Sequence, residues 1–122
     1  MYKPFIGMKK VVIWKTYTFK IHYLHKRRFM REQTIEQKLI QSTKARGGLA
    51  LKFVSPGYDG VPDRLVLLPK AKIGFVEVKA PGKKPRPLQL KRMSVLRQLG
   101  FKVFTLDNFD AIEEVLNAIQ SP

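Results

Sequence analysis

Residues 60–79 constrain the fold of this chain more than any other stretch. Two apolar runs, at 64–68 and 73–78, are separated by the turn-forming sequence Pro-Lys-Ala-Lys at 69–72. Short β-prone runs on either side of such a sequence are typical of two antiparallel strands joined by a short turn. The stretch therefore predicts a β-hairpin around which the rest of the chain is organised.

Three charged residues accompany these two strands. Period-two alternation places Glu77 and Lys79 on one face of the second strand, with Val76 and Val78 on the other. Asp63 lies at the start of the first strand, where it can close the group from the side. The sequence thus predicts two carboxylates and one ammonium group on a common surface.

This group has the composition needed for metal-assisted hydrolysis of a phosphodiester. Mg²⁺ is usually held by one or two carboxylates together with substrate phosphate and water. Such an ion activates water and neutralises charge on the phosphate, and a nearby ammonium orients the water or stabilises the developing charge. The alternative, equally compatible with the spacing, is an ordinary Glu77–Lys79 salt bridge on a half-exposed strand.

The charge balance points to a polyanionic partner. The 122 residues, enough for one domain, contain 24 Lys and Arg against 9 Asp and Glu, a formal net charge of +15. Nucleic acid is the first expectation and an anionic membrane surface the second. All the basic residues lie in 1–102, beside only five acids, and each acid there weakens phosphate binding unless a cation covers it. This is a second reason to expect a metal site.

Several kinds of site are not expected. The chain has no cysteine, which excludes a disulfide framework, a thiolate metal site and a cysteine nucleophile. Its two histidines both lie near the N-terminus with no second ligand cluster, so zinc is not expected. No apolar run approaches the length of a membrane span, and lysines interrupt the apolar N-terminal residues, so no secretory signal is expected.

The remaining elements are expected to sandwich the hairpin. Apolar periodicity and turn residues predict a helix at 31–46, a strand at 49–54, a helix from Pro87 to Gly100, a strand at 101–106 and a helix from Asp110. A strand-helix-strand crossover is right-handed, so the strand at 101–106 should run parallel to the one with Glu77. The expected inward residues are Ile35, Leu39 and Ile40, then in part Leu88, Leu96 and Leu99, then Ile112, Val115, Leu116 and Ile119.

Residues 1–29 differ in composition from the rest of the chain. They contain eight basic residues, no acids and seven of the thirteen aromatics. We interpret them as an added edge strand, a poorly ordered leader or a non-native extension before Met30. The alternative is an arm that lies along a nucleic acid. The domain itself is expected to span residues 30–122.

Five stretches, taken in order, resemble the virus-type replication-repair nuclease (VRR-NUC) domain of the PD-(D/E)xK nuclease superfamily. The matching stretches are Glu36 within 34–37, Phe53–Gly57, Gly60–Arg64, Phe75–Gly82 and Gln89 within 87–89. The ordered combination is much more specific than any single piece. The resemblance implies an α/β fold with a restriction-endonuclease-like core, in which helices flank a mixed sheet in the order α-β-β-β-α-β-α.

The resemblance also implies an activity: a Mg²⁺- or Mn²⁺-dependent endonuclease that hydrolyses phosphodiester bonds in DNA. It assigns Asp63 and Glu77 to the metal, helped by the Val78 carbonyl. Lys79 would position or activate water.

Two further residues gain a role only through the resemblance. Glu36 borders the buried face of its helix, and the pattern alone leaves it either solvated or near the site; the resemblance makes it the third acid. Gln89 would by itself be a surface residue, whereas the resemblance implies a hydrogen bond to the attacking water or the scissile phosphate.

Residues around these positions are candidates for holding DNA. The stiff basic loop at 80–87 is expected to contact the DNA backbone, with a solvated linker as the alternative. Tyr58, in the loop before Asp63, is expected either to pack on a base or ribose or to cover the core. The candidate DNA-binding residues are Lys83, Lys84, Arg86, Lys91, Arg92, Arg64 and Tyr58.

The resemblance finally implies partners and a place of action. Small stand-alone members of the family look like homodimers that cut branched DNA such as four-way junctions, in the cytoplasm of a bacterium or a phage-infected cell. No membrane contact and no small-molecule cofactor are expected. The alternatives are a non-catalytic basic nucleic-acid-binding module with the same fold, and an RNA-cleaving nuclease.

Overall fold

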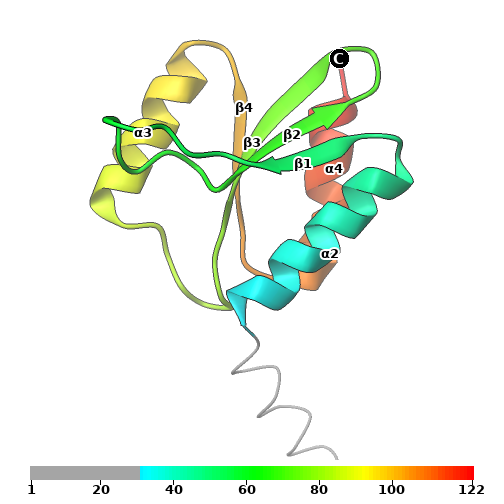
Figure 1. The fold of residues 1–122 in the computed structure, drawn as a ribbon, viewed down its shortest axis with the longest axis horizontal. Coiled ribbons are helices and arrows are strands. Elements are labelled where there is room, and N and C mark those ends of the chain that lie inside the picture. Colours follow the sequence, from blue (N-terminus) through cyan, green and yellow to red (C-terminus); the bar gives the residue numbers. More distant parts are fainter. Residues whose placement is uncertain (1–30) are drawn as a thin grey trace, which may run out of the picture. The chain divides into compact units, whose positions relative to one another are not determined.

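The computed structural model describes residues 31–122, and the expectations for residues 1–29 lie outside this range (Figure 1). The described elements follow the predicted order, with bounds within two residues of those expected. They are α2 (Glu32–Ala45), β1 (Leu49–Lys52), β2 (Arg64–Leu68), β3 (Lys72–Val78), α3 (Pro87–Gln98), β4 (Lys102–Leu106), η1 (Phe109–Ala111) and α4 (Ile112–Gln120). None of the helices within 31–122 has both the length and the apolar character needed to cross a lipid bilayer.

The four strands form one mixed sheet in the order β1-β2-β3-β4. The β1–β2 and β2–β3 pairs are antiparallel, and β3–β4 is parallel as predicted, because α3 carries the chain across from β3 to β4. Figure 1 shows α2 and α4 on one side of the sheet and α3 on the other. The expected α/β fold with helices flanking a mixed sheet is therefore confirmed.

The sheet face beneath α2 and α4 is closed by aliphatic packing. Ile35 and Leu39 of α2 and Leu116 of α4 have no exposed surface, as predicted from their spacing. A Cβ added at Gly74 of β3 would lie 2.5 Å from Cγ1 of Ile119, so α4 packs directly on the strand backbone. Only glycine permits this approach.

The opposite face packs on α3 over part of its width. Met93 of α3 packs with Phe75 of β3 and Val103 of β4, and Leu96 joins them at the edge. Leu88 and Leu99 were predicted to be partly buried; they are 43% and 68% exposed, and the fully buried residue of α3 is Met93, which was not predicted. Apolar residues occur all around α3, so their spacing alone could not select Met93 as the anchor.

The other part of this face is not covered by any element of residues 31–122. Strand pairing aligns Leu49 of β1, Leu67 of β2 and Ile73 of β3 in one row across the sheet, with Leu51 of β1 in the next row. Leu49, Leu51 and Ile73 are 56%, 43% and 39% exposed. We call these four residues the leucine face.

Two local features complete the fold. The Asn108 side chain accepts a 2.9 Å hydrogen bond from the Ala111 amide and caps the 3₁₀ turn η1, so the last helical segment begins just before the predicted start at Asp110. At the other end of the molecule, Lys70 and Ala71 of the β2–β3 turn have φ of 67° and 61°. Two of the three connecting residues thus adopt the left-handed conformation that Asn and Gly favour.

Candidate active site

Glu77 is the buried acid of the site. It lies on the α3 side of β3 and its side chain is 1% exposed. Its Oε2 meets two donors, Nζ of Lys79 at 3.0 Å and Nε2 of Gln89 at 2.8 Å, whereas its buried Oε1 has no hydrogen-bond partner. The predicted common face for Glu77 and Lys79 is confirmed. A buried carboxylate oxygen without a partner is costly unless a cation or a proton compensates it.

Asp63 stands beside Glu77, at the end of the connection from β1. Arg64 pairs with Val76, and extending that register by one residue places Asp63 opposite Glu77. Oδ2 of Asp63 accepts a 3.1 Å hydrogen bond from the Val78 amide. The two predicted carboxylates are thus neighbours on adjacent strands.

Both carboxyl groups have raised pKa values. For Asp63 the main cause is burial, which disfavours the charged form and outweighs the hydrogen bond from Val78. For Glu77 burial is again the main cause; the hydrogen bond from Lys79 lowers the pKa, the negative charge of Asp63 raises it, and the Asp63 backbone amide lowers it. A cation bound between Asp63 and Glu77 would therefore stabilise their ionised forms.

Glu36 is held by Arg64. Nε of Arg64 lies 3.0 Å from Oε2 of Glu36, and Nη1 donates to the Ala50 carbonyl at 3.1 Å. The Arg64 side chain is only 13% exposed. Arg64, a candidate DNA contact from the sequence, thus lies inside the protein with two of its nitrogens engaged, and its contact with DNA stays a prediction.

Gln89 connects the start of α3 to the site. It is 6% exposed, its Nε2 donates to Glu77, and its Oε1 accepts a 2.8 Å hydrogen bond from the Arg86 amide. The pattern alone placed Gln89 on the surface, and that interpretation is wrong because α3 turns this side chain, with Met93, toward the sheet.

Glu32 is an acid near the site that the sequence analysis did not select. Partial burial raises its pKa, the charges of Asp63 and Glu36 raise it further, and Lys79 lowers it. These influences mean that Glu32, one helical turn before Glu36, shares the electrostatic field of the site. The i, i+4 spacing of the two acids on α2 was the available signal.

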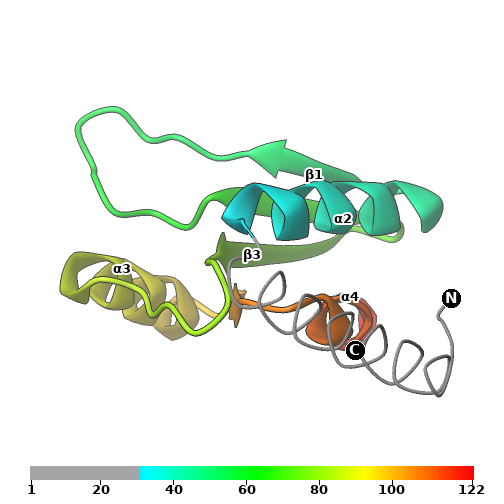
Figure 2. The same ribbon diagram turned by 90° about the horizontal axis from the view of Figure 1, so that it is seen from below.

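The loop before Asp63 is fastened to α3 through Arg92. The Arg92 guanidinium lies 3.9 Å from the centroid of the Tyr58 ring, and its Nε donates to the Asp59 carbonyl at 2.7 Å. Figure 2 shows this loop extending beyond the end of the sheet on the side of α3. Arg92 and Tyr58 therefore contact each other, a pairing that their separation in sequence concealed.

The remaining candidate DNA contacts are exposed. Lys83, Lys84 and Arg86 lie in the connection from β3 to α3, and Lys91 lies on α3. The basic loop therefore follows directly after Lys79 and leads to the helix that carries Gln89. Contact of these four side chains with DNA stays a prediction.

Comparisons with known proteins agree with this geometry. No protein-family model matches the chain. A phage protein called "Putative nuclease p44", from Acyrthosiphon pisum secondary endosymbiont phage 1, is 51% identical over 92 residues, which are 75% of this chain and 98% of that protein. A solved structure described as a VRR_NUC domain superposes with a TM-score of 0.66 at 33% identity, covering 70% of this chain and 94% of its own. The chain belongs to the VRR-NUC family of nucleases.

The VRR-NUC site has the chemistry that a divalent metal requires. Carboxylate oxygens are the ligands that Mg²⁺ and Mn²⁺ prefer, and Glu77 offers one that is buried and unpartnered. Within residues 31–122, no three acidic or histidine side chains gather closely enough to form a metal-binding group. The residues present thus fit an ion held by two protein carboxylates, with a backbone carbonyl, substrate and water available for its other positions.

Proposed function

We propose that this VRR-NUC protein is a Mg²⁺- or Mn²⁺-dependent endonuclease that hydrolyses phosphodiester bonds in DNA. One observation carries the proposal: Oε1 of Glu77 is buried without a partner, next to Asp63, in a strongly basic chain. If the Glu77–Lys79 ion pair were purely structural, burying Oε1 of Glu77 without a partner would cost stability with no compensating gain.

Asp63 and Glu77 bind the metal in this proposal, with the Val78 carbonyl as a third ligand. Glu36 completes the acidic cluster through water. When bound, the ion activates a water molecule and neutralises negative charge on the phosphate.

Lys79 acts on the reacting group. Its Nζ, 3.0 Å from Glu77, belongs to a side chain that is 15% exposed, so it is held in place and still reaches the surface. An ammonium there orients the attacking water and stabilises the charge that develops on the phosphate oxygens.

The exposed cations hold the DNA backbone. Lys83, Lys84, Arg86 and Lys91 contact phosphates, while Arg92 positions the Tyr58 loop against the substrate. Because phosphate contacts release counterions, affinity should fall steeply with salt. Arg64 contributes positive charge from beneath the surface.

We further propose that the protein cuts branched DNA, such as four-way junctions, as a homodimer that joins at the leucine face. Cutting two strands of one junction needs two sites, and a second copy supplies the other. Leu49, Leu51, Leu67 and Ile73 are uncharged, so two basic chains can meet there. A stable dimer buries about 800 Å² per partner, for which this face would be the apolar centre.

The phage origin of the relative called a nuclease supports action inside a bacterial or phage-infected cell.

A cleavage assay tests the activity. Labelled four-way, flap, nicked and linear DNA, and an RNA of matching sequence, are incubated with Mg²⁺, Mn²⁺ or EDTA. We expect metal-dependent cutting, reduced about 100-fold or more in Lys79→Ala and Glu77→Gln. Glu114→Gln, the same change at an exposed acid of α4, is the control. Binding without cutting in any metal would support the non-catalytic module, and cutting of RNA alone would support the ribonuclease.

Light scattering tests the dimer. Wild type should have twice the 14.1 kDa mass of one chain, and the double variant Leu49→Asp/Leu51→Asp should have the mass of a single chain. Leu99→Asp changes a more exposed leucine away from the leucine face and should leave the dimer intact. A monomeric wild type, or dissociation caused by Leu99→Asp, would contradict the proposed surface.

A further inference from the structure

Gln89 is almost completely buried at the start of α3. The side chain is 6% exposed although the first turn of α3 is otherwise open. Both ends of its amide are already engaged, one with the Arg86 backbone and one with Glu77. Each end keeps a second donor or acceptor position, so it is the burial of the residue that separates its amide from a scissile phosphate or an attacking water.

The orientation of this amide follows from its neighbours. The Arg86 backbone N–H can only donate, so the oxygen of the Gln89 amide must face it. The NH₂ group must then face Glu77, whose ionised carboxylate can only accept. The amide cannot be rotated by half a turn. Rotation would place its NH₂ group against the Arg86 N–H, donor against donor, and its oxygen against the Glu77 carboxylate, acceptor against acceptor.

The consequence falls on Glu77. Gln89 and Lys79 both donate to Oε2, at 2.8 and 3.0 Å, and neither contacts Oε1. A carboxylate fixed through one oxygen presents the other in a constant direction. Groups that hold a metal ligand in this way raise its affinity for the ion.

We infer that Gln89 is a positioning residue: it holds Glu77 by Oε2 so that Oε1 is presented to the metal, and it contacts neither the water nor the phosphate. The inference rests on the proposed metal-dependent function. It also gives the basic loop a structural role, because Arg86, whose amide orients Gln89, belongs to that loop and is the N-cap of α3.

Calorimetric titration with Mn²⁺ tests the inference without DNA or catalysis. Gln89→Met keeps the length of the side chain and removes its hydrogen bonds. We expect its Mn²⁺ dissociation constant to rise about 10- to 100-fold. Gln98→Met, the same change at the exposed last residue of α3, should leave Mn²⁺ affinity unchanged.

Cleavage and DNA binding distinguish the two possible roles of Gln89. If it positions Glu77, Gln89→Met should bind DNA normally in EDTA, and its kcat should return to within a few-fold of wild type at saturating Mn²⁺. Unchanged Mn²⁺ affinity with a lower kcat at every metal concentration would overturn the inference. It would mean that Gln89 contacts the attacking water or the phosphate.

Two further measurements keep the test decisive. Circular dichroism and a thermal melt check that Gln89→Met folds; if it does not, Gln89→Asn, too short to reach Glu77, should show the same loss of metal affinity. A wild-type protein that binds no Mn²⁺ would refute the proposed function itself. If wild type binds Mn²⁺ and Gln89→Met binds it equally well, only the role inferred for Gln89 is refuted.

Discussion

The two faces of the sheet are built for different purposes. Beneath α2 and α4, aliphatic side chains such as Ile35, Leu39 and Leu116 have no exposed surface. On the α3 side, the buried residues include Glu77 and Gln89, and the leucine face stays open. One face removes apolar surface from water, which stabilises the fold, and the other retains polar and exposed groups that cost stability.

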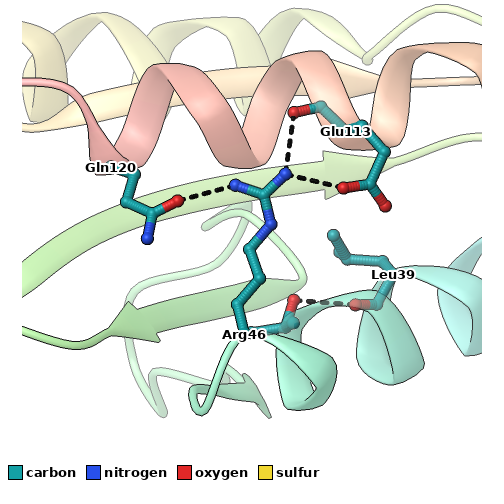
Figure 3. A network of polar contacts seen from close by, with 5 residues as sticks. Leu39, Arg46, Glu113 and Gln120 are labelled. Atoms are coloured by element: carbon teal, nitrogen blue, oxygen red, sulfur yellow. Dashed lines mark hydrogen bonds and ion pairs between the residues drawn. The ribbon is translucent and has the colours of Figure 1, made fainter.

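The polar groups on the two sides of the sheet also differ in whether their hydrogen bonds are satisfied. Arg46, at the end of α2, reaches α4 with Nη2 2.6 Å from Oε1 of Glu113 and Nη1 2.7 Å from Oε1 of Gln120 (Figure 3). These groups satisfy one another. On the α3 side, Glu77 keeps one oxygen unsatisfied. Unsatisfied buried polar atoms are rare in folded proteins, and here the atom coincides with the candidate site.

The sharpest test of this contrast is Glu77→Gln. Activity should fall about 100-fold or more, because the metal loses a ligand. Stability should not fall. Burial raises the pKa of Glu77, so above that pKa the ionised carboxylate destabilises the folded state. The neutral amide of the variant removes this cost, and its oxygen still accepts the hydrogen bond from Gln89. Chemical denaturation at pH 7 measures the free energy of unfolding. A loss above about 1 kcal/mol would mean that the ion pair with Lys79 stabilises the fold.

The matching test on the closed face is Leu116→Ala. Removing a fully buried leucine should cost about 2–5 kcal/mol of unfolding free energy. Leu49→Ala on the leucine face should cost less than about 1 kcal/mol, measured at low protein concentration where association does not contribute. Equal losses at the two positions would show that the leucine face is covered within the single chain.

A smaller effect is expected where the two strands of the hairpin meet. Lys70 and Ala71 hold left-handed conformations that suit Asn and Gly better. The double variant Lys70→Asn/Ala71→Gly should raise the free energy of unfolding by about 1–2 kcal/mol. Lys83→Asn/Ala80→Gly, in the basic loop, is a matched exchange without such strain. A lower stability in the turn variant would indicate that the lysine itself makes a stabilising contact.

The smallest effect concerns Glu113. The hydrogen bond from Arg46 is the main cause that lowers the pKa of Glu113 below its usual 4.5. A lowered folded-state pKa contributes stability above the unfolded value and loses it as pH falls through the folded value. Glu113→Gln should therefore cost under about 1 kcal/mol at pH 7, because the pair is exposed, and nothing in strong acid. Glu114→Gln should cost nothing at either pH; an equal loss in both variants would contradict a specific pair.

Much of the fold was predictable because its signals are local. Alternation in β3 determined that Glu77 and Lys79 share a face, and apolar spacing in α2 and α4 selected buried residues. The same reasoning failed to select Met93 as the buried residue of α3, where it predicted partial burial of Leu88, Leu96 and Leu99. Helical periodicity identifies a buried face only when apolar residues gather on one side.

The sequence by itself therefore determined the order of helices and strands, the excess of basic residues and the face shared by Glu77 and Lys79, since these depend on residue type and short-range periodicity. Only the tertiary structure decided which groups touch: Gln89 with Glu77, Arg64 with Glu36, Arg92 with Tyr58. Each pair joins elements that are distant in the chain. Their contacts depend on how whole helices pack on the sheet, and no short segment carries that information.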